Sequence, residues 1–99
     1  MEVIHDPEHT RFFIAADGGV AELVYNRMDE HTLELVHTGV SPALGHHGMG
    51  DALAKAAFAY AHANDIHVIL TCPFLRRWIL SHPEERDIVT RQSDEQERH

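Results

Sequence analysis

One stretch decides the fold: residues 32–63 read TLELVHTGVSPALGHHGMGDALAKAAFAYAHA, passing from a strand pattern through a glycine-rich segment to a helix pattern. Over residues 32–40, Leu33, Leu35 and His37 alternate with the residues between them. A period of two places such residues on one side of a β-strand. The sequence therefore predicts a strand over residues 32–40 with these three side chains on the same face.

The second half of this stretch has the spacing of a helix. Apolar residues recur three or four positions apart, at Met49, Leu53, Ala56, Ala57 and Tyr60, and this period predicts an amphipathic helix over residues 48–63. A short apolar run over residues 67–72 is typical of a strand buried inside a sheet. Strand, helix and strand form a βαβ unit, so the two strands should be parallel. Gly39, late in the first strand, often marks a bulge or a close approach of a ligand.

The residues before this unit predict a β-hairpin. Residues 11–15 and 20–25 are strand-like, and the glycines between them accept the positive φ angles of a tight turn. Antiparallel strands followed by a βαβ unit place the chain in the α/β (α+β) class, with a mixed sheet. Residues 1–90 are long enough for one domain with one core, and residues 91–99 form a polar tail without an apolar anchor.

A second, short helix is expected after the last strand. Pro73 stands where proline is favoured, at the first position of a helix. His82 and Pro83 end this helix. The pattern over residues 84–89 is too short to assign, although Ile88 and Val89 are expected to return to the core.

Composition excludes several classes of partner. Eight Lys and Arg against sixteen Asp and Glu give a net charge of -8, which opposes binding to nucleic acid or to an anionic membrane. No apolar run approaches the ~20 residues of a membrane span, and the first residues do not have the pattern of a signal peptide. We therefore expect a cytoplasmic protein. A single cysteine, Cys72, excludes an intrachain disulfide framework.

The glycine-rich segment has three candidate uses. Gly45, Gly48 and Gly50 allow the backbone to approach phosphate oxygens at a helix N-terminus, where N–H groups lack partners. The adjacent His46 and His47 invite a metal site, but adjacent side chains point in different directions, and neither a histidine four positions away nor a cysteine lies nearby. A flexible joint is the third use, and glycine spacing alone does not separate it from a phosphate cradle.

Two residues are candidates for chemistry at the end of the βαβ unit. Cys72 ends the second parallel strand and precedes a helix, a place where open sheets bind ligands and where a helix dipole stabilises a thiolate. Position alone leaves two interpretations open, a nucleophile or a small buried core residue. His37, one strand over, is a candidate base in the same crevice.

Separated pieces of the sequence together resemble a known family. They are HTGVSPALGHHGMG at residues 37–50, residues 53–57, and CPFLRRWILSHPE at residues 72–84, with His5 and residues 11–12 and 19–25 upstream. In this order they resemble the small, single-domain GCN5-related N-acetyltransferases, over roughly residues 3–89.

The resemblance implies a fold that binds acetyl-CoA, in which one strand splays from its parallel neighbour and admits the pantetheine arm. The loop before the main helix would hold the pyrophosphate, and Cys72 would lie near the thioester. Arg76 and Arg77 of the second helix are candidate contacts to CoA phosphates or to an acidic acceptor, although the sequence favours a solvated helix face for them. The candidate cofactor-binding residues are together Val36, Thr38, Gly39, Val40, Gly45, His46, His47, Gly48, Met49, Gly50, Cys72, Phe74, Arg76 and Arg77.

The loop departs from the family pattern, which is Arg or Gln, two variable residues, Gly, one variable residue, then Gly or Ala. Gly48 and Gly50 match, whereas Gly45 stands where the Arg or Gln should be. A charge-assisted contact to phosphate contributes about 1.5–3 kcal/mol, so we expect weaker CoA binding. We also expect it to tighten as pH falls from about 7.5 toward 6, because His46 and His47 gain charge.

Alternatives remain open for mechanism and for function. In transfer to a primary amine, Cys72 is either a transient acetyl carrier or part of the pocket wall, with His37 or a water taking the proton. A CoA-binding or interaction module without turnover is the rival function, and a histidine-rich metal binder is a third. The partners expected are acetyl-CoA and an unidentified amine, and the protein is expected to be a monomer or weak homodimer.

Overall fold

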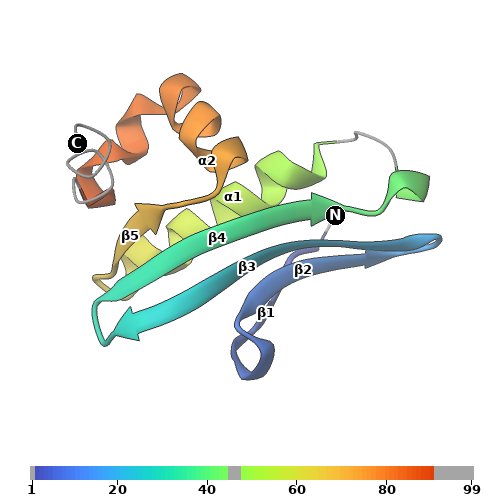
Figure 1. The fold of residues 1–99 in the computed structure, drawn as a ribbon, viewed down its shortest axis with the longest axis horizontal. Helices are drawn as coiled ribbons and strands as arrows, with labels where there is room; N and C mark the ends of the chain where they lie inside the picture. The colour runs from blue at the N-terminus through green and yellow to red at the C-terminus, as the bar shows by residue number, and fades with distance from the viewer. Residues whose placement is uncertain (1, 45–47, 91–99) are drawn as a thin grey trace.

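A computed structural model describes residues 2–44 and 48–90. One mixed sheet, ordered β1-β2-β3-β4-β5, runs through the molecule (Figure 1). Neighbouring strands are antiparallel except β4 and β5, which are parallel. The strands are β1 (Ile4–Asp6), β2 (Arg11–Ala16), β3 (Gly19–Asp29), β4 (Thr32–Val40) and β5 (His67–Leu70). The predicted class, antiparallel strands followed by a βαβ unit, is confirmed.

The helices follow the strands as the sequence predicts, with small differences in extent. They are α1 (Met49–Ala63), α2 (Pro73–Trp78) and four short 3-10 helices, η1 (Pro7–His9), η2 (Pro42–Leu44), η3 (Ile79–Ser81) and η4 (Pro83–Ile88). The second predicted helix is thus an α-helix with a 3-10 last turn. Neither α1 nor any other helix of the described ranges is long and apolar enough to cross a membrane.

Both α-helices share one buried core with the sheet. Alternate strand residues such as Phe12, Leu23 and Leu33 are buried against Leu53 of α1 and Leu75 of α2. The strand residues between them are mostly half-buried. The sheet therefore has a covered face, which carries the helices, and a second face that we call the outer face.

A β-bulge in β4 shifts which side chains reach the covered face. Tyr25 of β3 pairs with Leu35, but the preceding residue, Val24, pairs with His37. Val36 is the extra residue, so Val36 and His37 together oppose Val24. The prediction that His37 lies on the same face as the buried Leu35 is therefore wrong, because one inserted residue reverses every later side chain.

The two parallel strands separate directly after this point. Pairing of β4 with β5 ends at Leu35 and Leu70. The carbonyl oxygen of Leu35 accepts hydrogen bonds from the backbone N–H groups of both Thr71, at 3.1 Å, and Cys72, at 3.0 Å. Beyond this fork, β4 continues beside β3 but without β5, and the chain after β5 turns into α2 (Figure 1). We call residues 32–35 the paired half of β4 and residues 36–40 its open half.

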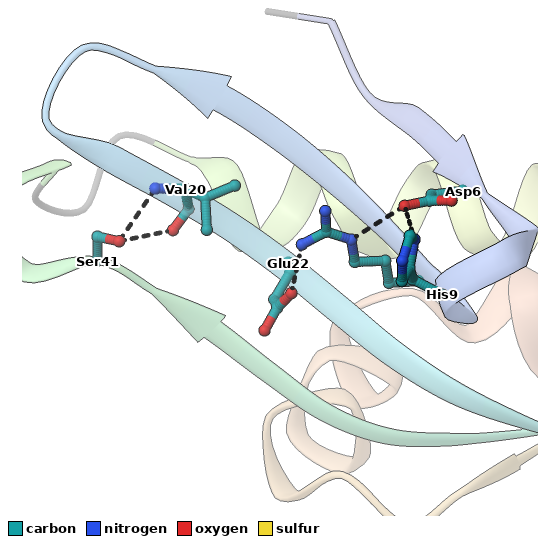
Figure 2. Close-up of polar contacts among 6 residues, drawn as sticks. Asp6, His9, Val20, Glu22 and Ser41 are labelled. Carbon is teal, nitrogen blue, oxygen red and sulfur yellow. Dashed lines mark hydrogen bonds and ion pairs between the residues drawn. The ribbon is translucent and has the colours of Figure 1, made fainter.

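The open half stays fastened to β3. Ser41 Oγ accepts a hydrogen bond from the backbone N–H of Val20, at 3.0 Å, and donates one to its carbonyl oxygen, at 2.9 Å (Figure 2). On the outer face, Arg11 bridges the carboxylates of Asp6 and Glu22, which ties β1, β2 and β3 together. The open half of β4 therefore has an unpaired edge, while these hydrogen bonds and ion pairs hold the rest of the sheet together.

Three other elements differ from expectation. The short strand β1 was not predicted, and β3 extends to Asp29 rather than to Tyr25. The segment left unassigned is the 3-10 helix η4, after which Val89 forms an isolated parallel bridge with Val68. Ile88 is buried and Val89 packs against the core, which confirms that this segment returns to it.

Candidate active site

A pocket of about 560 Å³ opens beside the fork. The open half of β4, the start of α1 and the helix α2 form its walls. Its lining residues are Thr38, Val40, Gly48, Met49, Gly50, Asp51, Phe74, Arg77 and Trp78. The sequence predicted seven of these nine as cofactor contacts, and Asp51 and Trp78 are additions. Three other predicted residues, Gly45, His46 and His47, lie outside the described residues.

Gly48 shapes the start of α1 at the pocket. Its φ of 79° lies in the left-handed region, which glycine enters at little cost. No side chain caps the helix, and the first bond of the turn runs from the N–H of Ala52 to the Gly48 carbonyl oxygen. Among the described residues, no side chain bonds to the N–H groups of this first turn, and N–H groups in that position can bind an anion.

Gly50 is required for a different reason. A Cβ atom at this position would lie 2.9 Å from Cζ of Phe74, which is closer than real Cβ contacts. The absent side chain lets the phenyl ring of α2 pack against the first turn of α1. The two matching glycines of the loop motif thus serve two functions, one conformational and one in helix packing.

The open half of β4 turns backbone groups toward the pocket. The N–H of Ser41 bonds to the carbonyl oxygen of Val20, and hydrogen-bonded pairs alternate along an antiparallel ladder. Gly39 therefore bonds to β3, whereas the backbone N–H and C=O groups of Thr38 and Val40 point away from β3. On that side β5 has already ended, which leaves these groups available to a ligand.

Cys72 lies behind the pocket wall. The residue is 2% exposed, and its Sγ donates a hydrogen bond to Thr38 Oγ1 at 3.4 Å. Thr38 lines the pocket and Cys72 does not. Cys72 was interpreted as either a nucleophile or a small buried core residue, and its surroundings are those of a buried core residue.

His37 and Cys72 are not brought together. His37 is exposed on the outer face, and its ring lies over Gly39, where a Cβ atom would be 3.0 Å from His37 Nε2. Thr38, the next residue, carries its side chain on the covered face toward Cys72. The shared crevice expected for His37 and Cys72 is therefore absent, since the bulge sends the imidazole to the opposite face.

Glu34 was missed by sequence reasoning. Its carboxylate lies on the outer face beside the fork, where it accepts hydrogen bonds from Thr71 Oγ1 at 2.5 Å and Asn26 Nδ2 at 3.3 Å. Neither donor carries a charge, and Glu34 has no ion-pair partner within residues 2–44 and 48–90. The available signal was that Glu34 is the one carboxylate in the predicted strand.

The two arginines of α2 have different surroundings. Arg77 lines the pocket and forms no ion pair with another described residue. Arg76 Nε instead donates a hydrogen bond to the Leu70 carbonyl oxygen at 2.9 Å, at the end of β5. Arg77 is therefore the guanidinium available to a pocket ligand. Four predicted contacts, Val36, Gly39, Cys72 and Arg76, do not line this pocket.

Asp51 and Trp78 join the two helices at the pocket. Trp78 Nε1 donates to Asp51 Oδ1 at 2.9 Å, and the Lys55 ammonium lies 3.1 Å from the other carboxylate oxygen. The Trp78 hydrogen bond, followed by the one from Lys55, lowers the pKa of Asp51 below its ordinary value. His82 stacks on Trp78 with 3.8 Å between ring centroids. Only the Asp51 and Lys55 spacing was visible in the sequence.

Comparisons with known proteins show which family this sequence and fold resemble. A family profile described as GCN5-related N-acetyl-transferase matches residues 11–88. The protein NATD1 of Xenopus tropicalis is 29% identical over 85 residues, which cover 84% of this chain and 78% of that protein. NATD1 of Gallus gallus is 28% identical over 85 residues, covering 84% and 77%.

A solved structure is also similar over most of its length. The NMR solution structure of a GCN5-like protein from Staphylococcus aureus superposes with a TM-score of 0.71 at 28% sequence identity. The match covers 90% of this chain and 87% of that one. With the family profile spanning most of the sheet and both α-helices, the chain belongs to the GCN5-related N-acetyltransferase family.

Proposed function

We propose that this protein transfers an acetyl group from acetyl-CoA to a primary amine. The observation that carries the proposal is the fork in the sheet. It leaves the edge of the open half of β4 that faces away from β3 unpaired, beside a pocket that begins at a helix N-terminus with no side-chain cap. A long ligand with an anionic end and amide groups along its length matches these two features.

The pocket residues fit the parts of CoA in order. The N–H groups at Gly48 to Gly50 and the guanidinium of Arg77 suit phosphate oxygens. The backbone groups of Thr38 and Val40 suit the pantetheine amides, and the apolar side chain of Phe74 covers the arm between them. The acetyl group would then lie toward the fork, at the end of the pocket farthest from the helix N-terminus.

The amine is proposed to arrive from the outer face. Helices occupy the covered face, whereas the outer face next to the fork carries the carboxylate of Glu34. That carboxylate is held by two neutral donors and is available to a cationic amine, from which it takes a proton so that the neutral amine can attack. Glu34, rather than His37, is our first candidate for the base, because the His37 ring leans away from the fork over Gly39.

Incubation of the protein with acetyl-CoA and a panel of primary amines tests the proposal. Release of free CoA thiol, measured together with the mass of the acetylated amine, is the expected result. Calorimetric titration with CoA measures binding in parallel, and heat-denatured protein is the control for uncatalysed acetylation. Absence of both binding and release contradicts the proposal.

The rival function, a CoA-binding module without turnover, keeps one observation in its favour. A thiol buried behind Thr38 is not exposed as a nucleophile. Saturable CoA binding without thiol release across the amine panel would favour this module. Stoichiometric retention of Zn²⁺ without CoA affinity would instead favour the metal binder.

A further inference from the structure

Of the two β4 residues that line the pocket, Thr38 is the nearer to the fork along the strand. It lies three positions beyond Leu35, where pairing with β5 ends, and Val40 lies two positions farther on. At about 3.3 Å per residue, Val40 is some ~7 Å farther from the fork than Thr38. A ligand whose phosphates occupy the α1 end of the pocket therefore brings its other end to Thr38.

The Thr38 hydroxyl has a fixed hydrogen-bond acceptor role on one side. Cys72 Sγ donates to Thr38 Oγ1 at 3.4 Å, and Cys72 is 2% exposed, so its thiol proton has no solvent to use instead. A hydroxyl accepts with its lone pairs and donates its own hydrogen. Within residues 2–44 and 48–90, no side chain takes that hydrogen, and Thr38 lines the pocket.

We propose that the Thr38 hydroxyl donates a hydrogen bond to the carbonyl oxygen of the acetyl thioester, and that Cys72 is a positioning residue that orients this hydroxyl. The inference rests on the proposed function. It assigns Cys72 neither as an acetyl carrier nor as inert filling. The thiol keeps its proton and acts only through Thr38.

In the proposed step, the amine is neutral when it reaches the thioester. The amine nitrogen attacks the thioester carbon, a C–N bond forms, and the electron pair of the C=O bond moves to oxygen, where Thr38 stabilises the charge. The electron pair then returns from oxygen to re-form the C=O bond, the C–S bond breaks, and CoA leaves as a thiolate, which takes a proton from solvent. Glu34 takes one proton from the cationic amine before the attack and passes it to solvent, and the second proton, which the nitrogen loses as the amide forms, leaves by the same route.

Infrared spectroscopy tests the Cys72 to Thr38 bond without any substrate. The chain has one cysteine, so the S–H stretching band belongs to Cys72 alone. In Thr38→Val, which has the same shape without a hydroxyl, the band is expected to move to higher frequency. Thr38→Ser should leave it in place, and thermal denaturation shows whether each variant is folded. An unchanged band in Thr38→Val overturns the orienting role of Cys72.

Kinetics test the donation to substrate. Loss of one such donor lowers kcat by about 100-fold or more in known cases. Thr38→Val should therefore reduce kcat about 100-fold with little change in the KM for acetyl-CoA, and Thr38→Ser should retain most activity. In Cys72→Ala, kcat should fall roughly tenfold, and in Cys72→Ser it should return toward the wild-type value. Full kcat in Thr38→Val, or an acetylated Cys72 found by mass spectrometry during turnover, overturns the proposal.

A spectroscopic measurement separates failure of this inference from failure of the proposed function. The carbonyl carbon of bound ¹³C-acetyl-CoA should resonate downfield of the free compound in wild-type protein, and the shift should be lost in Thr38→Val. Wild-type protein that shows this shift but acetylates no amine contradicts the proposed function alone. The same resonance in wild type and Thr38→Val contradicts the inference alone, and no binding at all contradicts both.

Discussion

The two halves of β4 belong to one strand but have opposite uses. The paired half bonds to β3 and β5, and its Leu33 and Leu35 are completely buried. The open half bonds to β3 alone, and its residues are half-buried or exposed. Side chains of the first half contribute to the core, whereas the backbone groups of the second half that point away from β3 are available to a ligand. The backbone groups available to a ligand thus begin where pairing with β5 ends.

A single bulge lies at the boundary between these halves. Val36 is the extra residue there, and pairing with β5 ends at Leu35, directly before it. The bulge increases the local twist of the strand, which accompanies the divergence of the two parallel strands. It also decides that Thr38, not His37, faces Cys72.

Leu35→Ala breaks the paired half and should have the largest effect on stability. A fully buried leucine replaced by alanine leaves a cavity and costs about 2–5 kcal/mol in free energy of unfolding. Urea denaturation followed by circular dichroism measures the loss. Val40→Ala, in the open half, removes a partly buried side chain and should cost less. Equal losses would show that the two halves do not differ in their share of the core.

Glu34→Gln sharpens the comparison on the outer face of the fork. The amide keeps the shape and can accept from Thr71 but cannot take a proton, so kcat for amine acetylation should fall by about 100-fold. Initial rates of CoA release at saturating acetyl-CoA measure the effect. His37→Gln is the matched control from the open half and should keep most of the rate. An equal fall in kcat in His37→Gln and Glu34→Gln would contradict the assignment of Glu34 as the base and would favour the His37 imidazole.

Gly50→Ala and Gly48→Ala probe the wall that faces the open half. The new Cβ at Gly50 would lie 2.9 Å from Phe74 Cζ and must displace the ring, at an overpacking cost of about 1–3 kcal/mol. At Gly48 the space is open, but φ is 79°, and the left-handed conformation costs about 1–2 kcal/mol for alanine. Calorimetric titration with CoA should show a greater loss of affinity for Gly50→Ala than for Gly48→Ala. The reverse order would show that backbone strain at Gly48 affects CoA binding more than the packing of α2 at Gly50.

The pH dependence of stability tests the surroundings of the paired half and should be the smallest effect. Tyr25, the register partner of Leu35, bonds through its hydroxyl to His5 Nε2 at 2.7 Å. Burial, and secondly the charge of Arg27, lower the pKa of His5 below its ordinary value of 6.5. The unfolded chain therefore binds more protons just below pH 6.5, so stability falls as pH decreases through that region.

Thermal unfolding between pH 7.5 and 5.5 measures this dependence. His5→Phe keeps the stacking on Phe12, where the ring centroids are 4.3 Å apart, and has no proton to gain. The melting temperature of this variant should depend less on pH than that of the wild type. An identical slope in both proteins would remove His5 from the account.

The strands and helices that the sequence revealed are those with an unbroken period. Leu53 and Ala57 repeat at helical spacing, and α1 begins within one residue of the prediction. Leu33 and Leu35 alternate as a strand should, and both are buried. In the sequence this alternation continues to His37, but in the structure the bulge at Val36 interrupts it. Hydrophobic periodicity did not indicate the bulge.

The candidate site divides along the same line. Glycine spacing and the resemblance together identified Gly48, Gly50 and most of the pocket lining. Asp51 and Trp78 were not found, because their hydrogen bond joins positions 27 residues apart on two helices. Glu34 was not found because a charged residue in an alternating strand is typical of a solvated face. Contacts between distant elements are what one sequence does not show.

The indole ring of Trp78, whose N–H bonds to Asp51, gives the protein a fluorescence signal of its own. Trp78 is the one tryptophan of the chain, it is 7% exposed, and it lines the pocket. Indole emission responds to the polarity around the ring and to the partner of its N–H group. We therefore expect the natural fluorescence of the unlabelled protein to change when a ligand binds at this wall, and stopped-flow mixing would follow that binding in real time.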